Sequence, residues 1–465
     1  MGVYNKMKIE QIYTGCLAQG AYYIESMGEV AIIDPLREIN PYLSKIDQNN
    51  HSLKFIFETH FHADFVSGHV SLAKATGAQI IYGPEATTKF EISNAKDGEE
   101  FKLGEITIKA IHTPGHTLES TCYLLIDAEG NQQALFSGDT LFIGDVGRPD
   151  LAQQGLKLTS EDLAGIMYDS LRNKIMTLDK NVIIYPAHGA GSACGKKMSS
   201  ETSDTLQNQL QHNYALRQDM SKEEFVSEVL DGLADPPKYF ADNVKLNQEG
   251  YKEVDSLLKE NRNKLLTADE FEQIANESQP VILDVRSKEE FSLNHIPNSI
   301  FIGLDGPFAP WVGEMLVDIN TPILLVTSST EMFEEAQIRL SRVGFDNILG
   351  TIDGGINSWI DSGRETESIN NINPSEFIKT EKNNIIDVRK PSEYDVASYS
   401  NATNLSLSEL GMNLSKVSDE KSYVYCGSGY RSLIAISLLK SKGFHNLVNV
   451  EDGFKGISEN LQSEK

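Results

Sequence analysis

The sequence has few cysteines, no long apolar run and too little basic charge to offset its acidic side chains. Its 465 residues include only four cysteines, which are too few for a disulfide framework. No stretch reaches the roughly 18 apolar residues of a transmembrane helix, and the first residues lack the apolar core of a signal peptide. These features predict a cytoplasmic protein with reduced thiols.

The charge balance excludes two classes of binding partner. There are 41 Lys and Arg residues against 67 Asp and Glu, a formal net charge of −26. A nucleic-acid-binding protein neutralises phosphates with a basic surface, so that role is not expected. An anionic membrane surface would repel the chain as well. The partners that remain are small molecules. The sequence leaves the oligomeric state open, and the chain could form a homo-oligomer.

The length predicts roughly three domains, at about 150 residues each. Residues 1–262 form the first, in which many short strands are interrupted by helical stretches such as 69–76 and 160–177. This mixture indicates sheets packed together with helices outside. Its last part, from about residue 200, is a polar helical extension.

The rest of the chain contains an internal repeat. Asp284-Val-Arg286 returns as Asp387-Val-Arg389, 103 positions later, and Glu290 returns as Glu393 at the same offset. A period near 100 is too long for a solenoid. We therefore expect two copies of one domain, 265–365 and 370–465, each an α/β unit with a mainly parallel sheet.

Polar clusters rich in histidine and aspartate follow several apolar strands of the first domain. Because strand ends lie along one edge of a sheet, we expect these side chains to converge. Imidazole and carboxylate groups are ligands for divalent transition metals. The candidates are His60, His62, Asp64, His116, Asp139 and His188.

This series resembles the metallo-β-lactamase superfamily, over about residues 8–190, and within it the branch of glyoxalase II and the persulfide dioxygenases. The resemblance implies an αββα sandwich. In persulfide dioxygenases it implies one Fe(II) per chain held by His60, His116 and Asp139, the facial triad of non-haem iron enzymes. His62, Asp64 and His188 would then orient ligands or water. Of these three, His62 is the one that could instead bind the metal directly.

One departure from the superfamily pattern bears on the reaction. Dinuclear hydrolases have His-x-His-x-Asp-His, whereas here the last position is Phe65. A phenyl ring cannot coordinate a metal, so a second ion between Asp64 and His188 loses a ligand. A mononuclear site is therefore favoured, and a dizinc thioester hydrolase of the glyoxalase II kind is the alternative.

Two further residues of this domain are candidates for substrate chemistry. The match of Gly147-Arg148-Pro-Asp150 to the dioxygenases implies that Arg148 binds a carboxylate of a thiol substrate. Cys194 lies six residues after His188 in a glycine-rich loop, where we interpret it as a persulfide-handling thiol. Lys196 and Lys197 are expected to lower its pKa.

The last domain contains a second reactive motif, Cys426-Gly-Ser-Gly-Tyr-Arg431, between an apolar strand and an apolar helix. Loop N–H groups at a helix N-terminus stabilise a thiolate, and the cation of Arg431 can bind an anion such as sulfite. The motif resembles the active loop of rhodanese sulfurtransferases. In the first copy Thr327 and Met332 stand at the corresponding positions, so that copy is expected to be catalytically inactive and to serve as a structural or docking module.

Taken together, the resemblances imply a bifunctional enzyme of sulfide detoxification. A low-molecular-weight persulfide would be oxidised by O₂ to sulfite, and the rhodanese domain would transfer sulfane sulfur to sulfite, giving thiosulfate. Glutathione, coenzyme A, bacillithiol and cysteine all remain open as the thiol. The alternative from a different class is a non-catalytic sulfur sensor or carrier.

Overall fold

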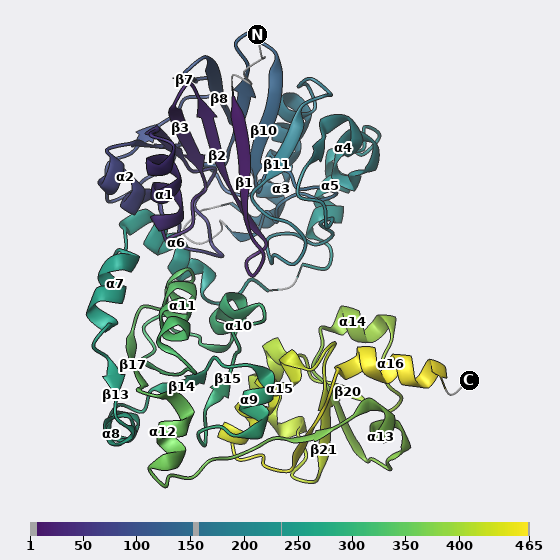
Figure 1. Cartoon of the computed structure of the whole chain (residues 1–465). Coiled ribbons are helices and arrows are strands. Elements are labelled where there is room, and N and C mark those ends of the chain that lie inside the picture. Colours follow the sequence, from purple (N-terminus) through teal and green to yellow (C-terminus); the bar gives the residue numbers. More distant parts are fainter. Residues whose placement is uncertain (1–6, 152–157, 234, 464–465) are drawn as a thin grey trace. The chain divides into compact units, whose positions relative to one another are not determined.

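The structure is a computed structural model that describes residues 7–151, 158–233 and 235–463 (Figure 1). Residues 1–6, on which the signal-peptide expectation depends, lie outside this range. The chain divides into two compact units, residues 1–256 with 341–344 and residues 257–340 with 345–465. Among the described residues, no helix has both the length and the apolar character needed to cross a membrane.

The first unit is built on two six-stranded sheets. The first runs in the order β1-β2-β3-β4-β5-β6, antiparallel up to β3 and parallel beyond it. The second runs β12-β11-β10-β9-β8-β7, with β10 and β11 as its parallel pair. The strands are β1 (Lys8–Thr14), β2 (Gln19–Ser26), β3 (Glu29–Ile33), β4 (Ser52–Phe57), β5 (Gln79–Tyr82), β6 (Ser93–Asn94), β7 (Glu100–Leu103), β8 (Ile106–His112), β9 (Thr121–Ile126), β10 (Gln132–Gly138), β11 (Ile183–Pro186) and β12 (Asp204–Thr205).

Helices cover the outer face of each sheet (Figure 1). Beside the first sheet lie α1 (Asn40–Gln48) and α2 (His69–Thr76), and beside the second lie α3 (Ser160–Ser170), α4 (Leu206–His212) and α5 (Lys222–Leu230). A π-helical turn (Leu171–Ile175) extends α3 and a 3₁₀ turn (Tyr214–Leu216) follows α4. The helical extension continues with α6 (Phe240–Glu249) and α7 (Val254–Asn261).

Three hydrophobic clusters hold these layers together. One joins helix residues such as Tyr42 and Leu72 to the outer face of the first sheet. A second lies between the sheets and includes Tyr22 and Phe136. The third joins the second sheet to α3 and α5, with Met167 among its members. Apolar burial on both faces of both sheets gives the expected αββα sandwich.

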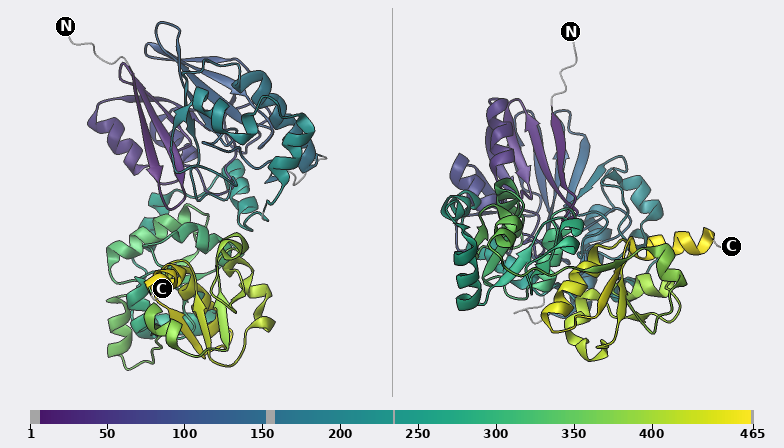
Figure 2. Two further views of the ribbon diagram at one scale, coloured as in Figure 1. Left: turned by 90° about the vertical axis from the view of Figure 1, so that its right-hand side faces the viewer. Right: turned by 60° about the horizontal axis from the view of Figure 1, so that its bottom comes forward.

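The second unit, coloured from green to yellow in Figure 2, contains two five-stranded sheets. The two sheets have the same strand order, and all of their pairings are parallel. The first has β13 (Leu265–Leu266), β14 (Val281–Asp284), β15 (Ile300–Phe301), β16 (Ile323–Val326) and β17 (Ile348–Ile352), with helices α8 (Ala268–Ser278), α9 (Lys288–Leu293), α10 (Phe308–Met315), α11 (Thr330–Ser341) and α12 (Gly355–Asp361). The second has β18 (Asn370–Ile372), β19 (Asn384–Asp387), β20 (Thr403–Asn404), β21 (Ser422–Tyr425) and β22 (Leu447–Val450), with α13 (Pro374–Lys379), α14 (Pro391–Val396), α15 (Tyr430–Ser441), α16 (Gly453–Ser463) and two 3₁₀ turns (Leu407–Met412 and Leu414–Lys416).

The repeated Asp-Val-Arg segments make the same contacts in both copies. Nη2 of Arg286 donates to Oδ2 of Asp284 at 2.6 Å and to a backbone carbonyl eight residues on. Arg389 makes the matching pair of bonds with Asp387 and with the carbonyl of Ala397. The sequence repeat is therefore a structural repeat, and we call the two copies the first and the second repeat.

Candidate metal centre and sulfurtransferase loop

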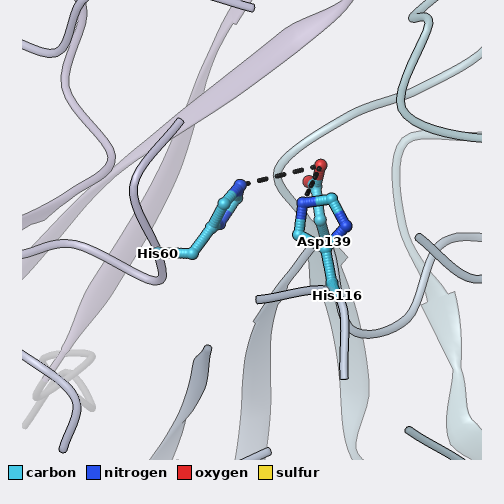
Figure 3. Close-up of side chains that lie close together, drawn as sticks. All are labelled: His60, His116 and Asp139. Atoms are coloured by element: carbon cyan, nitrogen blue, oxygen red, sulfur yellow. Dashed lines mark ion pairs between the residues drawn. The ribbon is translucent and has the colours of Figure 1, made fainter. Parts of the chain in front are cut away.

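Three of the expected ligands, each shortly after the end of a strand, converge in the first unit (Figure 3). His60 follows β4, His116 follows β8 and Asp139 follows β10. Nε2 of His60 and Nε2 of His116 lie 3.8 and 3.5 Å from Oδ2 of Asp139. All three side chains are buried. We expected the ligands along one sheet, but β4 belongs to the first sheet and β8 and β10 to the second, so the site joins the ends of both.

Two glycines allow this close approach of the loops. Gly138 has φ of +54°, and a Cβ there would lie 2.6 Å from the Cβ of Thr59, which precedes His60. A Cβ on Gly147 would lie 2.0 Å from the carbonyl oxygen of Asp139 and 3.0 Å from Nδ1 of His116. Any side chain at either position would push the ligand-bearing loops apart.

Hydrogen bonds fix both histidines in the form that a metal requires. Nδ1 of His116 lies 2.7 Å from the carbonyl oxygen of Arg148, so this nitrogen donates and Nε2 is the atom that a metal would bind. Nδ1 of His60 lies 3.0 Å from Oγ1 of Thr59, whose hydroxyl donates in turn to Asp34 at 2.8 Å. The His60 Nδ1–H therefore also donates, and its Nε2 faces Asp139.

Charge at the site matches this ligand set. Burial and the neighbouring His62 lower the pKa of His60 well below its ordinary value, which keeps the imidazole neutral. Burial alone would raise the pKa of Asp139, but His188 and His60 hold it well below its usual range. Oδ2 of Asp139 is buried and accepts no hydrogen bond from any residue that the structure describes. Two imidazoles and a carboxylate oxygen without a donor fit a divalent metal ion.

His188 lies between two carboxylates. Its Nδ1 is 2.8 Å from Oδ1 of Asp139 and its Nε2 is 2.8 Å from Oδ2 of Asp64. Burial would lower the pKa of His188, but the charges of Asp139 and Asp64 raise it well above its ordinary value. His188 and Asp64 thus form a chain that supports Asp139.

His62 packs against His60, with 4.2 Å between the ring centroids, and its Nε2 contacts two carboxylates. Its Nε2 lies 3.1 Å from Oδ1 of Asp34 and 3.5 Å from Oε2 of Glu58, and all three side chains are buried. Burial would lower the pKa of His62, but Asp34 raises it to about 10. Sequence reasoning missed Asp34, Glu58 and Thr59, although Asp34 ends an apolar strand and the other two directly precede the His60 motif.

Arg148 lies in the loop that carries the ligand contacts, and its guanidinium is bound within the chain. Nε and Nη2 donate to the two carboxylate oxygens of Asp150 at 2.7 and 2.6 Å, and the side chain is buried. The site thus already contains one carboxylate bound in the bidentate manner expected for a substrate.

Cys194 is buried beside the supporting chain, and its Sγ, a ring nitrogen of His188 and a carboxylate oxygen of Asp64 all lie within 4.8 Å of one another. Burial raises its pKa well above the ordinary value, and Asp64 and Asp139 raise it further. The expectation that Lys196 and Lys197 lower this pKa is wrong. Nζ of Lys196 donates to the carbonyls of Glu228 and Asp231, and Nζ of Lys197 pairs with Glu228 at 3.6 Å.

The Cys426 loop of the second repeat has the expected strand–loop–helix setting. Cys426 follows β21, is buried, and accepts a hydrogen bond at Sγ from the N–H of Gly429, 3.2 Å away. Gly429 has φ of +91° and directly precedes α15. Nη1 and Nη2 of Arg431 donate to the two oxygens of Glu393 at 2.6 and 2.8 Å, a partner that the sequence indicated only as a repeat marker.

The corresponding loop of the first repeat is closed by its own contacts. Oγ1 of Thr327 lies 3.0 Å from Oγ1 of Thr351, and the N–H of Ser328 donates to Sδ of Met332 at 3.4 Å. The hydroxyl of Ser328 donates to Glu290. Thr327 and Met332 provide neither the thiol nor the cation found in the Cys426 loop. All four cysteines of the chain are free of disulfide bonds.

Comparison with known proteins agrees with both domain types. The metallo-beta-lactamase superfamily model matches residues 14–188, and the rhodanese-like domain model matches residues 267–362 and 375–460. A metallo-beta-lactamase structure from Staphylococcus aureus is 31% identical, with a TM-score of 0.66, over 75% of this chain and 99% of that one.

Two curated relatives match part of this chain. A probable hydroxyacylglutathione hydrolase of Schizosaccharomyces pombe is 32% identical over 41% of this chain and 72% of its own length. A cytoplasmic hydroxyacylglutathione hydrolase of Arabidopsis thaliana is 29% identical over 39% of this chain and 67% of its own length. The chain belongs to the metallo-beta-lactamase superfamily and has two rhodanese-like domains in addition, which confirms the predicted fold class. Both domain types indicate an enzyme.

Proposed function

We propose that the chain is an Fe(II)-dependent persulfide dioxygenase joined to a thiosulfate-forming sulfurtransferase. The observation that carries the proposal is Phe65 beside a complete set of two histidines and one aspartate. That set suits one iron ion and leaves coordination positions open, whereas a second metal would lack a ligand at residue 65.

His60, His116 and Asp139 would hold the iron, one ion per chain. Iron(II) supplies the one-electron chemistry that lets O₂ react with sulfur compounds. His188 and Asp64 would keep the Asp139 carboxylate oriented, and Thr59 and the Arg148 carbonyl would keep the two imidazoles oriented. His62 would bind Asp34 and Glu58, and Asp34 in turn accepts the hydrogen bond of Thr59.

The overall reaction balances as R–S–S–H + O₂ + H₂O → R–S–H + SO₃²⁻ + 2H⁺. The outer sulfur is oxidised, gains both atoms of O₂ and takes its third oxygen from water, and the S–S bond breaks to leave the thiol. Arg148 would receive a substrate carboxylate in place of Asp150, because exchange of one carboxylate for another keeps the guanidinium paired. Cys194 would contact the persulfide from the side of His188.

The second reaction takes place at Cys426. Its thiolate attacks the outer sulfur of a persulfide, forms a new S–S bond and releases R–S⁻. Sulfite then attacks that sulfur, thiosulfate forms and the Cys426 thiolate is regenerated. The Gly429 N–H and Arg431 would stabilise the negative charge on the loop. Because both sites lie on one chain, the local concentration of sulfite at its acceptor would be raised.

The substrates of this scheme are low-molecular-weight persulfides, O₂ and sulfite. Neither nucleic acid nor a membrane takes part, in keeping with a net charge of −26. We place the reaction in the cytoplasm, where four unpaired thiols fit a reducing compartment.

The competing function is hydrolysis of a glutathione thioester with two zinc ions, because the two curated relatives are named as hydroxyacylglutathione hydrolases. The test is to load the metal-free protein with Fe(II) or with Zn(II), and to measure O₂ uptake with a panel of persulfides and hydrolysis of thioesters. The proposal predicts O₂ uptake only in the iron-loaded protein. Thioester hydrolysis by the zinc-loaded protein, with no O₂ uptake in either form, would contradict it.

A further inference from the structure

The second unit contains a cavity of about 600 Å³ whose walls come from both repeats. Helix α9 of the first repeat contributes Lys288 and Glu289. The second repeat contributes Gly429 from the Cys426 loop and Glu451 and Asp452 from the end of β22. A cavity of this size accommodates a small molecule rather than a protein segment.

The two walls are joined by direct contacts. The backbone of His295 exchanges both hydrogen bonds, at 2.8 and 2.9 Å, with that of Glu367 in the segment between the two repeats. The N–H of Phe301 donates to Oγ of Ser437 in α15 at 3.0 Å. The hydroxyl of Tyr430, the residue after Gly429, donates to the carbonyl of Gly303 at 2.7 Å. The first repeat thus fixes the start of α15, on which the reactive loop depends.

The cavity reaches a residue that contacts the reactive thiol. Gly429 lines the cavity, and its N–H donates to Sγ of Cys426. A side chain at Gly429 would begin 3.9 Å from Nζ of Lys288. An ammonium group of the first repeat therefore lies against the loop of the second.

Lys288 is not explained by the stability of its own helix. It is the first residue of α9, where the helix dipole disfavours a cation. The equivalent position of the second repeat, 103 residues on, is Pro391. Among the described residues, Lys288 has one ion pair, a 3.8 Å contact with its neighbour Glu289. Arg431, by contrast, is already paired with Glu393.

The remaining charges of the cavity restrict what it can bind. Three carboxylates line the cavity as well, that of Glu289 beside Lys288 on α9 and those of Glu451 and Asp452 in the second repeat, together with Asn371 and Asn449. Such a lining repels a ligand with several phosphates and attracts one that carries both an ammonium and a carboxylate.

We propose that this cavity is the donor site of the sulfurtransferase, that the catalytically inactive repeat supplies its specificity through Lys288, and that the donor is an amino-acid or small-peptide persulfide. The inference rests on the proposed role of Cys426. The donor carboxylate binds Lys288, its ammonium faces Glu451 and Asp452, and its outer sulfur reaches Sγ of Cys426. Transfer breaks the S–S bond of the donor, forms the S–S bond of the Cys426 persulfide and releases the donor thiolate.

The test uses the full chain without O₂, so that oxidation of the donor does not interfere, with sulfite as acceptor and thiosulfate as the measured product. We expect wild-type kcat/KM to be at least about tenfold higher for cysteine persulfide than for coenzyme A persulfide. Lys288→Ala should raise KM for cysteine persulfide about tenfold and leave kcat within about twofold of the wild-type value. Lys288→Arg keeps the cation and should restore the wild-type KM. Lys379→Ala removes an exposed lysine of the same unit and should change neither value.

Glu451→Lys adds a cation to the cavity wall. It should reduce the ratio of kcat/KM for cysteine persulfide to kcat/KM for coenzyme A persulfide. If Lys288→Ala has the wild-type KM while the wild type transfers sulfur, the inference is wrong and the role of Cys426 stands. If the wild type transfers sulfur from neither donor, the proposed function of Cys426 itself fails. Equal unfolding midpoints of the variants exclude a loss of fold as the cause.

Discussion

Nδ1 of His188 lies 2.8 Å from Oδ1 of Asp139, so the carboxylate that faces His60 and His116 through one oxygen is held through the other. The second ring nitrogen of His188 contacts Asp64. In a dinuclear hydrolase Asp64 and His188 would share a second metal with residue 65. Residue 65 of this chain is phenylalanine, and we propose that Asp64 and His188 here support the ligand of a single metal ion.

The first prediction concerns that missing ligand. Phe65 is fully buried, and its ring centroid lies 6.4 Å from that of His188. Phe65→His should restore a ligand beside Asp64 and raise the metal content from about one to about two ions per chain, measured by elemental analysis after loading. Phe65→Leu, which removes the ring without adding a ligand, should stay near one. A content near one ion for Phe65→His would show that Phe65 does not block the second site.

The second prediction concerns Thr59, which connects His60 to Asp34. Thr59→Val keeps the shape of the side chain but leaves Nδ1 of His60 without its acceptor. We expect metal affinity to fall about 10- to 100-fold, measured by competition with a chelator. Thr59→Ser keeps the hydroxyl and should bind like the wild type. Equal affinity of all three proteins would refute the orienting role.

The third prediction concerns pH. Burial lowers the pKa of His295 in the first repeat to about 4, against an ordinary value of 6.5. Between these values the unfolded chain binds a proton that the native repeat does not. The free energy of unfolding should therefore fall as the pH drops from 6.5 toward 4, by at most about 1.4 kcal/mol per pH unit from this group.

Hydrogen exchange of the first repeat in the full chain measures this dependence. His295→Asn removes the titrating group and should flatten the pH slope of the exchange protection, whatever its effect at pH 7. An unchanged slope in His295→Asn would mean that other groups cause the loss of stability.

The fourth prediction concerns the loop of the first repeat that corresponds to the Cys426 loop. Thr327→Cys, made together with Cys426→Ser, should give no thiosulfate. Met332 provides no cation, and Glu331 adds a negative charge next to it that repels sulfite. The assay is thiosulfate formation from persulfide and sulfite, with Cys426→Ser alone as the background. Formation above that background would show that a thiol alone makes a rhodanese-like loop active.

Much of this architecture could be predicted from the sequence, because the residues that indicate each element lie close together in the sequence. The helix at 69–76 has the bounds that its pattern predicts. Asp-Val-Arg recurs at a fixed offset because each copy forms the same buried ion pair. The ligand motifs are short segments directly after strands, and such segments need no knowledge of the tertiary structure to be found.

The contacts that join distant segments could not be predicted in this way. Glu393 lies 38 residues from Arg431, and nothing in its local sequence indicates the pairing. Lys196 and Lys197 lie near Cys194 in sequence, but their ammonium groups bind α5 and the residue that follows it. Lys288 becomes a candidate only once the first repeat is seen to line a cavity beside the Cys426 loop.

The most direct test of the central claim is the ratio of O₂ consumed to sulfite formed by the iron-loaded Cys426→Ser variant. This variant lacks the sulfurtransferase thiol, so sulfite should accumulate instead of being converted to thiosulfate. We predict about one O₂ per sulfite, as the balanced reaction requires, with O₂ uptake close to that of the wild type. Sulfite formation without O₂ uptake, or no reaction with any persulfide, would contradict the account.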